Sequence, residues 1–322
     1  MSERSGLGLL EVAVLEAVAE CGAGPNQRFV KSAKIVGTLE RTNGIAPDYG
    51  YAVLCDLAAP WLLRVPLVDG HGNFGSPDFE PSAPRYNEAR LSPAGAMALD
   101  AELGGPPLPI GLINGDVHVG GQRPPFNPER LAATVERLLN GDDLTDVQLL
   151  DAVGPPEFPT GCEVEGDLSG LTRGEATPLR LSARLTQIEA ISSHDRLRPA
   201  IVVSHLPPGI GGNQLIEVLT ARARTPEWEP DEPDLATEAR LPIADVADMT
   251  HGTWENTRLH VFPSSGVALD SLEAGLKKVW GITIDVRVQL PAPLAPLLRS
   301  WVAQHSDEAD LRSGMRRFRA VL

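Results

Sequence analysis

The sequence predicts a multi-domain protein of the α+β class, with a helix-rich N-terminal part followed by a part in which strands and helices alternate. Before residue 60, apolar residues recur at three- and four-residue spacing, which is typical of amphipathic helices. Beyond residue 176, several runs alternate apolar and polar side chains, which is typical of strands. The chain has 322 residues, of which 42% are hydrophobic, so it is long enough to bury more than one core.

The N-terminal part is predicted to begin with three short helices. The spacing of apolar residues places these helices at 7–20, 28–40 and 48–59. Glycines near residue 22 end the first helix, and Pro60 halts the third. A turn-rich segment and a further helix over 88–102 follow. This succession favours helix-turn-helix or winged-helix geometry.

The part beyond residue 120 is predicted to begin with one well-delimited helix, NPERLAATVERLLNG, with Asn127 as its N-cap and Gly141 as its stop. Strands are expected in 177–189, 198–208, 257–265 and 282–291, and helices in 213–224, 268–281 and 293–305. The last helix runs into a basic tail, RRFRAVL. The acid- and proline-rich segment 225–248 is expected to be a solvated loop or insertion.

Composition narrows the class of protein. The formal charge of −15, from 28 basic and 43 acidic residues, disfavours a surface that binds a polyanion over its whole extent, so any contact with nucleic acid is expected to be local. There is no apolar run of about 18 residues and no signal-peptide pattern, so a cytoplasmic protein is expected. Cys21, Cys55 and Cys162 form no CxxC pair and are expected to be buried thiols, with neither a disulfide nor a metal site.

The stretch LVDGHGNFGSPDFEPSAPRYNEARL, residues 67–91, resembles the breakage-reunion region of type IIA DNA topoisomerases, the family that includes the A subunits of DNA gyrase and topoisomerase IV. In that family, an LVDGxGNFGS run leads into an RYTE motif, which is matched here by residues 85–88. Further similar words, in the same order, are KSAKIVG at 31–37, LAAPWLLR at 57–64, LINGD at 112–116, VGPPEFPTG at 153–161 and ITIDVRVQL at 282–290. The resemblance therefore covers most of the chain.

The resemblance implies that Tyr86 is a nucleophile that cuts DNA by forming a phosphotyrosyl link to the 5′ end. A tyrosine phenol, with an ordinary pKa of about 10, is mostly neutral at pH 7. The attack therefore needs positive charge near the phosphoryl oxygens, and Arg85 is expected to supply it through its permanently charged guanidinium. As a bare dipeptide, Arg85-Tyr86 would indicate no more than a surface pair at a helix start.

Other residues are expected to contact DNA. The candidates for a sequence-independent grip on backbone phosphates are Lys31, Ser32, Lys34, Arg64 and Arg123. Without its sequence context, the motif KSAK would indicate only a solvent-exposed helix face. The family also wedges an isoleucine between base pairs to bend the duplex, and here Val117 or Val119 would have to take that place.

The expected layout follows from the resemblance. Residues 1–128 would form a winged-helix DNA gate, residues 129–292 a tower-like α/β domain, and residues 293–322 the start of a truncated coiled coil. The chain shows neither a DxD cluster in a glycine-flanked strand nor a GxxxxGK[ST] loop. Mg²⁺ and ATP are therefore expected in a separate B-type (ATPase) subunit. The expected partners are double-stranded DNA, this B-type protein and a second copy of the chain itself, with no membrane.

The sequence also departs from the family pattern. The stretch RTNGIAPDYG, residues 41–50, lacks both histidines of the family's HPHGD motif, and the chain stops where the family's long coiled coil begins. These differences leave a second hypothesis open, a shortened and catalytically degenerate paralogue that regulates gyrase by binding DNA or the partner subunit. A third hypothesis, a purely structural interaction fold, predicts no affinity for DNA even at low salt.

Overall fold

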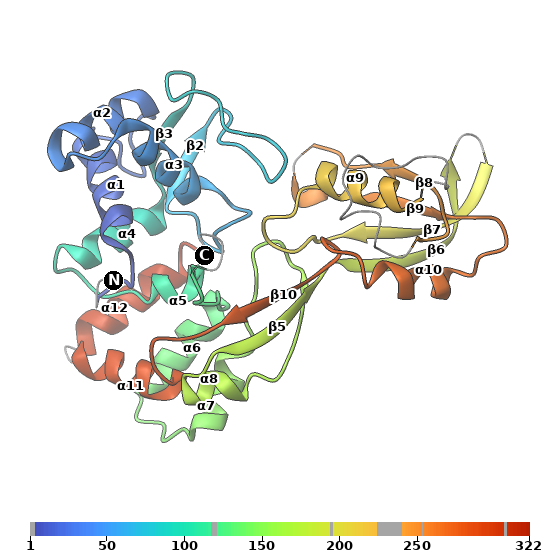
Figure 1. Cartoon of the computed structure of the whole chain (residues 1–322). Helices are drawn as coiled ribbons and strands as arrows, with labels where there is room; N and C mark the ends of the chain where they lie inside the picture. The colour runs from blue at the N-terminus through green and yellow to red at the C-terminus, as the bar shows by residue number, and fades with distance from the viewer. Residues whose placement is uncertain (1–3, 117–120, 194–195, 224–239, 253, 306–307) are drawn as a thin grey trace. The chain divides into compact units, whose positions relative to one another are not determined.

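The computed structural model describes residues 4–116, 121–193, 196–223, 240–252, 254–305 and 308–322. The chain divides into two compact units (Figure 1). Unit 1 comprises Met1–Pro159, Gly166–Pro178 and Arg287–Leu322, and unit 2 comprises Thr160–Glu165 and Leu179–Val286. The predicted α+β class is confirmed, since helices stand beside small antiparallel sheets. Among the described residues, no helix has the length and apolar character needed to span a bilayer.

Unit 1 begins with the three predicted helices, α1 (Leu9–Glu20), α2 (Ser32–Asn43) and α3 (Pro47–Ala58). Figure 1 shows them together, in blue, at the N-terminal end of the colour scale. Their contact faces are fully buried and include Val14, Leu15, Val18, Ile35, Leu39 and Leu54. Helix α2 starts later than predicted, because Val30–Lys31 pair as strand β1.

A three-stranded antiparallel sheet completes this part of unit 1. Its order is β1-β3-β2, with β2 at Val68–His71 and β3 at Glu88–Leu91. The prediction of one helix over 88–102 is wrong at its start, because residues 88–91 alternate between half-buried and buried and pair with both neighbours. The helix itself, α4 (Pro93–Glu102), begins at a proline, and the Ser92 side chain caps it by accepting from the Gly95 amide.

The rest of unit 1 is helical, with α5 (Ile110–Asn114), α6 (Pro128–Leu139), α7 (Asp146–Val153), α8 (Ser169–Arg173), α11 (Leu294–Gln304) and α12 (Glu308–Arg319). The predicted cap of α6 is confirmed, since the Asn127 side chain accepts from the Arg130 amide at 2.9 Å. Gly141 follows α6 with a positive φ of 84°, as expected for a stop. The basic tail was not predicted to be helical, but Leu311, Met315 and Phe318 form a fully buried stripe on α12.

The two compact units do not follow the boundaries expected at residues 128 and 292. Helices α6 and α7 lie beyond residue 128, yet they pack against α11 and α12 and belong to unit 1. The amphipathic face of α6 buries Leu131 and Val135 in these contacts. Unit 1 is therefore built from both ends of the chain. The names DNA gate, tower and coiled coil remain predictions.

Unit 2 contains most of one antiparallel sheet, whose strands continue into unit 1 at residues 177–178 and 287–288, and all of a second. One has the order β10-β5-β4, formed by β4 (Glu163–Glu165), β5 (Thr177–Ser182) and β10 (Thr283–Val288). The other has the order β6-β7-β9-β8, formed by β6 (Arg184–Ser193), β7 (Arg196–Ser204), β8 (Ile243–Asp248) and β9 (Leu259–Pro263). Its apolar face packs on helices α9 (Gly212–Ala223) and α10 (Leu269–Leu276), through a core that includes Ile201, Val203, Leu215, Leu259, Val261 and Leu272.

The predicted solvated loop at 225–248 is wrong for its last residues. Ile243–Asp248 form β8, because Ile243 and Val246 contribute to the core and the strand pairs antiparallel with β9. Residues 224–239 of that segment lie outside the described residues. Cys21, Cys55 and Cys162 are free thiols, and Cys55 and Cys162 are buried as expected, whereas Cys21 is only partly buried.

Candidate active site

Arg85 and Tyr86 lie in a turn directly before β3, not at a helix start. The Tyr86 side chain projects to the surface and is 63% exposed. The Arg85 guanidinium carbon lies 4.7 Å from the centroid of the Tyr86 ring, a cation–π contact that holds the positive charge beside the phenol. Arg85 is exposed as well, and among the described residues no carboxylate pairs with it. The turn thus presents a hydroxyl and an uncompensated guanidinium together.

The start of α2 anchors this turn. The Ser32 amide donates to the Asn87 carbonyl at 2.9 Å, and the Ala33 amide donates to the Pro84 carbonyl at 3.1 Å. The first-turn amides of a helix have no partner within the helix, so these carbonyls satisfy two of them. Because Pro84 and Asn87 flank Arg85-Tyr86 on both sides, the turn is fixed against the positive end of the α2 dipole.

Asn87 holds the turn from the other side. The residue is 1% exposed, and its side chain links three segments. Its Oδ1 accepts from the Asn73 amide at 3.0 Å, and its Nδ2 donates to the Tyr51 hydroxyl at 2.6 Å and to the Ser82 carbonyl at 3.3 Å. The Tyr51 hydroxyl in turn donates to the Ser82 carbonyl, and burial raises the pKa of Tyr51 to about 12. The family motif has threonine where Asn87 stands, so sequence reasoning gave no sign of this network.

Replacing Asn87 by alanine is expected to lower the free energy of unfolding by about 2–3 kcal/mol, because it removes the acceptor of the Asn73 amide and the donor to the buried Tyr51 hydroxyl. Urea denaturation measures the change. The control is Asn43→Ala at the exposed end of α2, where a change within about 0.5 kcal/mol is expected. Equal effects of the two substitutions would contradict the role assigned to Asn87.

The three residues predicted to contact phosphate around the start of α2 differ in their surroundings. Lys31 forms an ion pair with Glu88, with 3.0 Å between Nζ and Oε1, and this contact lowers the pKa of the Glu88 carboxyl. Ser32 is fully buried and presents no surface, and its hydroxyl has no hydrogen-bond partner among the described residues. Lys34 is exposed and has no ion-pair partner in the described part of the chain. Of the two lysines, Lys34 is therefore the one without an ion pair among the described residues.

The two predicted arginines outside α2 are held within the chain. Arg64 pairs with Glu157 at 3.1 Å. Arg123 is 8% exposed, pairs with Asp116 at 3.2 Å and donates to the Gly6 carbonyl at 3.0 Å. Both contacts give these side chains a structural role in this conformation, and their role toward DNA remains a prediction. Val117 and Val119, the predicted wedges, lie outside the described residues.

The surroundings of Tyr86 do not fit a magnesium site by themselves. Glu88, the carboxylate two residues away, is tied to Lys31. Over the ranges that the structure describes, no three His, Cys, Asp or Glu side chains gather as a metal site would require.

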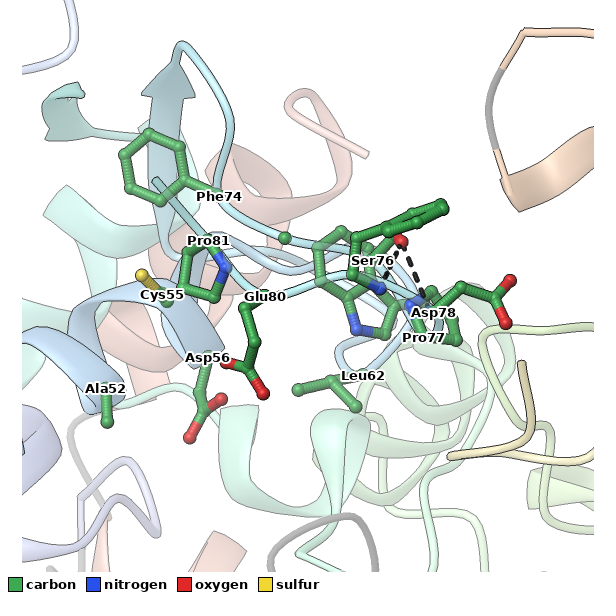
Figure 2. Close-up of a pocket in the computed structure, with 13 residues that line it drawn as sticks. Ala52, Cys55, Asp56, Leu62, Phe74, Ser76, Pro77, Asp78, Glu80 and Pro81 are labelled. Carbon is green, nitrogen blue, oxygen red and sulfur yellow. Dashed lines mark hydrogen bonds between the residues drawn. The ribbon is translucent and has the colours of Figure 1, made fainter. Parts of the chain in front are cut away.

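A pocket of about 320 Å³ lies between α3 and the segment 74–81, and Figure 2 shows its lining residues. The Ser76 hydroxyl shapes the segment by accepting from the amides of Asp78 and Phe79, at 3.2 and 3.1 Å. Burial raises the pKa of the Cys55 thiol to about 12, so it is not a thiolate at neutral pH. Burial, and then the charge of Glu11, raise the pKa of Asp56 to about 6.

The raised pKa of Asp56 predicts that this residue lowers the stability of the folded protein by an amount that depends on pH. Its value in the folded protein, about 6, lies above the ordinary 3.8, so the folded state binds more protons between these values and loses stability as the pH rises through this window. Asp56→Asn removes this cost. The variant is expected to gain stability relative to the wild type between pH 4 and pH 7, on the order of 1 kcal/mol, in urea titrations at both pH values. A constant difference between the two proteins would refute the assignment.

No protein-family model matches the sequence. Individual proteins do match it. The chain is 30% identical over 237 residues to the A subunit of DNA topoisomerase 4 from Synechocystis sp., covering 63% of this chain and 25% of that protein. It is 29% identical over 320 residues to the A subunit of DNA gyrase from Granulibacter bethesdensis, covering 87% of this chain and 33% of that protein. It is 28% identical over 314 residues to the A subunit of DNA topoisomerase 4 from Pseudomonas aeruginosa, covering 88% of this chain and 39% of that protein.

The chain is a diverged relative of the A subunits of DNA gyrase and topoisomerase IV. The resemblance drawn from the RY motif and its surrounding words is thereby confirmed. This A-subunit relative spans between a quarter and two fifths of the length of the three proteins named above. Its identities to the gyrase and topoisomerase IV proteins are nearly equal, so they do not assign it to either branch.

Proposed function

We propose that this protein is an A-type subunit of a type IIA topoisomerase, which cuts and rejoins DNA strands through Tyr86 together with a separate B-type subunit. The observation that carries the proposal is the exposed Arg85-Tyr86 turn, anchored on the start of α2 and on Asn87. A hydroxyl that must meet a phosphate needs access, a fixed position and nearby positive charge. This turn supplies all three within one short segment.

The proposed reaction is a transesterification. The Tyr86 hydroxyl oxygen attacks a backbone phosphorus in line, a bond forms between that oxygen and phosphorus, and the bond from phosphorus to the 3′ oxygen breaks. The phenol loses its proton to solvent, and the 3′ oxygen leaves as a hydroxyl. The product is a 5′ phosphotyrosyl ester, and the reverse reaction rejoins the strand. Arg85 would donate hydrogen bonds to the phosphoryl oxygens as their charge grows.

The architecture of unit 1 supports a winged-helix DNA gate. Helices α1, α2 and α3 stand beside the small sheet β1-β3-β2, which is the set of elements that a winged helix requires. In this proposal α2 faces DNA, where the exposed Lys34 contacts the phosphate backbone. Unit 2 would correspond to the tower, and α11 with α12 to the approach to a coiled coil.

The proposal includes partners. A B-type subunit would hold Mg²⁺ and hydrolyse ATP, and Mg²⁺ would neutralise charge on the phosphate that Tyr86 attacks. Two copies of this chain would place two Tyr86 hydroxyls on opposite strands of one duplex. The reaction would take place in the cytoplasm, where the protein meets chromosomal DNA.

Covalent trapping tests the proposal. The full chain is incubated with nicked duplex DNA, Mg²⁺ and the B-type subunit encoded in the same genome, and is then denatured. A protein–DNA adduct that ends on a 5′ phosphate is the expected result. Salt-sensitive DNA binding without any adduct would instead support the degenerate paralogue, and absence of DNA binding at low salt would refute both.

A further inference from the structure

The four-stranded sheet of unit 2 has a groove on the face that is turned away from its core. Side chains along β7 alternate between the two faces of the sheet. Ile201 and Val203 point into the core with α9 and α10. Val202 and Ser204 therefore point to the opposite face. The groove on this second face has a volume of about 640 Å³. Its other wall is formed by residues 249–252 and 254–258, between β8 and β9.

Strand register gathers cationic side chains in this groove. Arg184 of β6 lies opposite Ser204 of β7, so both line the same face, and His205 follows directly. Arg258 lines the opposite wall, where its Nε donates to His260 Nε2 at 3.2 Å and its amide donates to the Thr250 hydroxyl at 3.1 Å. The two guanidinium groups thus enter the groove from two different segments.

The two guanidinium groups have no ion-pair partner within the part of the chain that the structure describes. Among the described residues, neither Arg184 nor Arg258 forms an ion pair with a carboxylate, although the protein as a whole carries a charge of −15. Glu255 is the one carboxylate among the described residues that line the groove. Burial, and then the charge of Arg184, lower the pKa of His205, so its ring is a neutral hydrogen-bonding group beside the guanidinium. An anion bound here would offset the charge of the two guanidinium groups.

His205 is also held in an unusual backbone conformation. Its φ is 51°, and among the described residues it is the one non-glycine residue with a positive φ. A positive φ is uncommon for residues other than glycine, although histidine adopts it more often than most, and it is retained where the surroundings enforce it. Its Nδ1 lies 3.0 Å from the Ser204 hydroxyl, which fixes the ring at the end of the groove beside Arg184.

Beside the charged groups, part of the floor of the groove is apolar. Ile188 and Val202 line it, together with Met249, whose side chain is 38% exposed. An exposed methionine is a soft, adaptable contact for a planar ring. The combination of an apolar floor and neighbouring guanidinium groups fits an organic anion better than a bare ion.

We propose that this groove binds a small organic phosphate with a planar body, of the nucleoside monophosphate class, through Arg184, Arg258 and His205. The size of the groove lies within the range of small-ligand sites, about 300–1,000 Å³. A long polyanion is the less favoured occupant, because it would extend beyond the groove over a protein of strongly negative charge. The inference does not rest on the topoisomerase activity of Tyr86.

Calorimetric titration of the full chain tests the proposal with adenosine 5′-monophosphate as the probe, and with inorganic phosphate and adenosine as its two halves. The monophosphate is expected to bind more tightly than either half, because it contacts the apolar floor and the guanidinium groups together. Arg184→Gln and Arg258→Gln are each expected to weaken its binding about tenfold or more. The matched control is Arg180→Gln, an exposed arginine of the same unit that pairs with Asp285, and it should leave binding unchanged.

The variants also provide a check on folding. Arg184 forms no ion pair among the described residues, so Arg184→Gln should keep the unfolding midpoint of the wild type. Arg258→Gln also removes the hydrogen bond to the buried His260, so a lower midpoint is expected for that variant, and its binding is measured well below that midpoint. Absence of monophosphate binding at millimolar concentration, or binding that neither arginine substitution weakens, would overturn the proposal. A short DNA duplex that binds through these arginines, while the monophosphate does not bind, would overturn it in favour of a polyanion. Tyr86→Phe should bind the monophosphate as the wild type does, which separates this inference from the proposed cleavage activity.

Discussion

Protein carrying Tyr86→Phe is expected to form no covalent adduct with DNA under conditions in which the wild type does. The substitution removes only the phenolic oxygen, so the ring and its contact with Arg85 remain. Without a nucleophile, the phosphodiester cannot be exchanged for a protein ester, and the adduct signal should fall by at least a factor of about 10³. Denaturing gels of labelled nicked duplex, run with Mg²⁺ and the B-type subunit, measure it.

The chain offers a matched control for this substitution. Tyr49 on α3 is 62% exposed, close to the 63% of Tyr86, and Tyr49→Phe should leave the adduct unchanged. Arg85→Gln should reduce the rate of adduct formation by about 10²–10³, because it removes a charge that acts on the transition state. Arg85→Lys should restore only part of this loss, since an ammonium lacks the planar fork of donors. An adduct that persists in Tyr86→Phe, or that disappears in Tyr49→Phe, would refute the assignment.

Gly95→Ala is expected to cause the largest loss of stability among the glycine substitutions in helices. A Cβ at Gly95 would lie 1.8 Å from the Leu67 carbonyl oxygen, which belongs to the backbone just before β2. That carbonyl also accepts from the Ser92 amide at 3.1 Å, so it cannot move without breaking the start of α4. The substitution would force α4 away from the sheet. It is expected to lower the free energy of unfolding, measured by urea denaturation, by about 3 kcal/mol or more.

Gly37→Ala provides the opposite expectation in the same assay. Gly37 also lies within a helix, α2, but a Cβ there would meet no atom within 4 Å and its φ is not positive. Alanine is therefore expected to stabilise the protein by about 0.5–1 kcal/mol, because it restricts the unfolded chain. A loss of stability of similar size in both variants would show that close approach to Leu67 is not the cause.

The helices with a clear amphipathic period could be predicted from the sequence, and so could local signals such as the Asn127 cap and the Gly141 stop. Strand β3 could not, because it has four residues and its partners in β1 and β2 lie far away in the sequence. For the same reason Asn87 was not recognised, since its partners Tyr51 and Asn73 lie 36 and 14 residues away.

The candidate site shows the same limit. The motif predicted which residues could act on DNA, but it could not predict which charges are already paired. Lys31 and Arg64 are each tied to a carboxylate that sequence spacing does not bring near them. Electrostatic partners of this kind depend on the tertiary arrangement. The cationic groove of unit 2 could not be predicted from the sequence either, because Arg184 and Arg258 come from segments that meet only when β7 and β9 pair.

The division of unit 1 between two distant stretches of chain has a consequence for synthesis on the ribosome. Helices α6 and α7 are translated before unit 2, whereas α11 and α12, which cover them, are translated after it. At an elongation rate of about 5–20 residues per second, the apolar surface around Leu131 and Val135 therefore stays exposed for several seconds before α11 and α12 are synthesised. A nascent chain of this protein would be a natural client for chaperones during that interval.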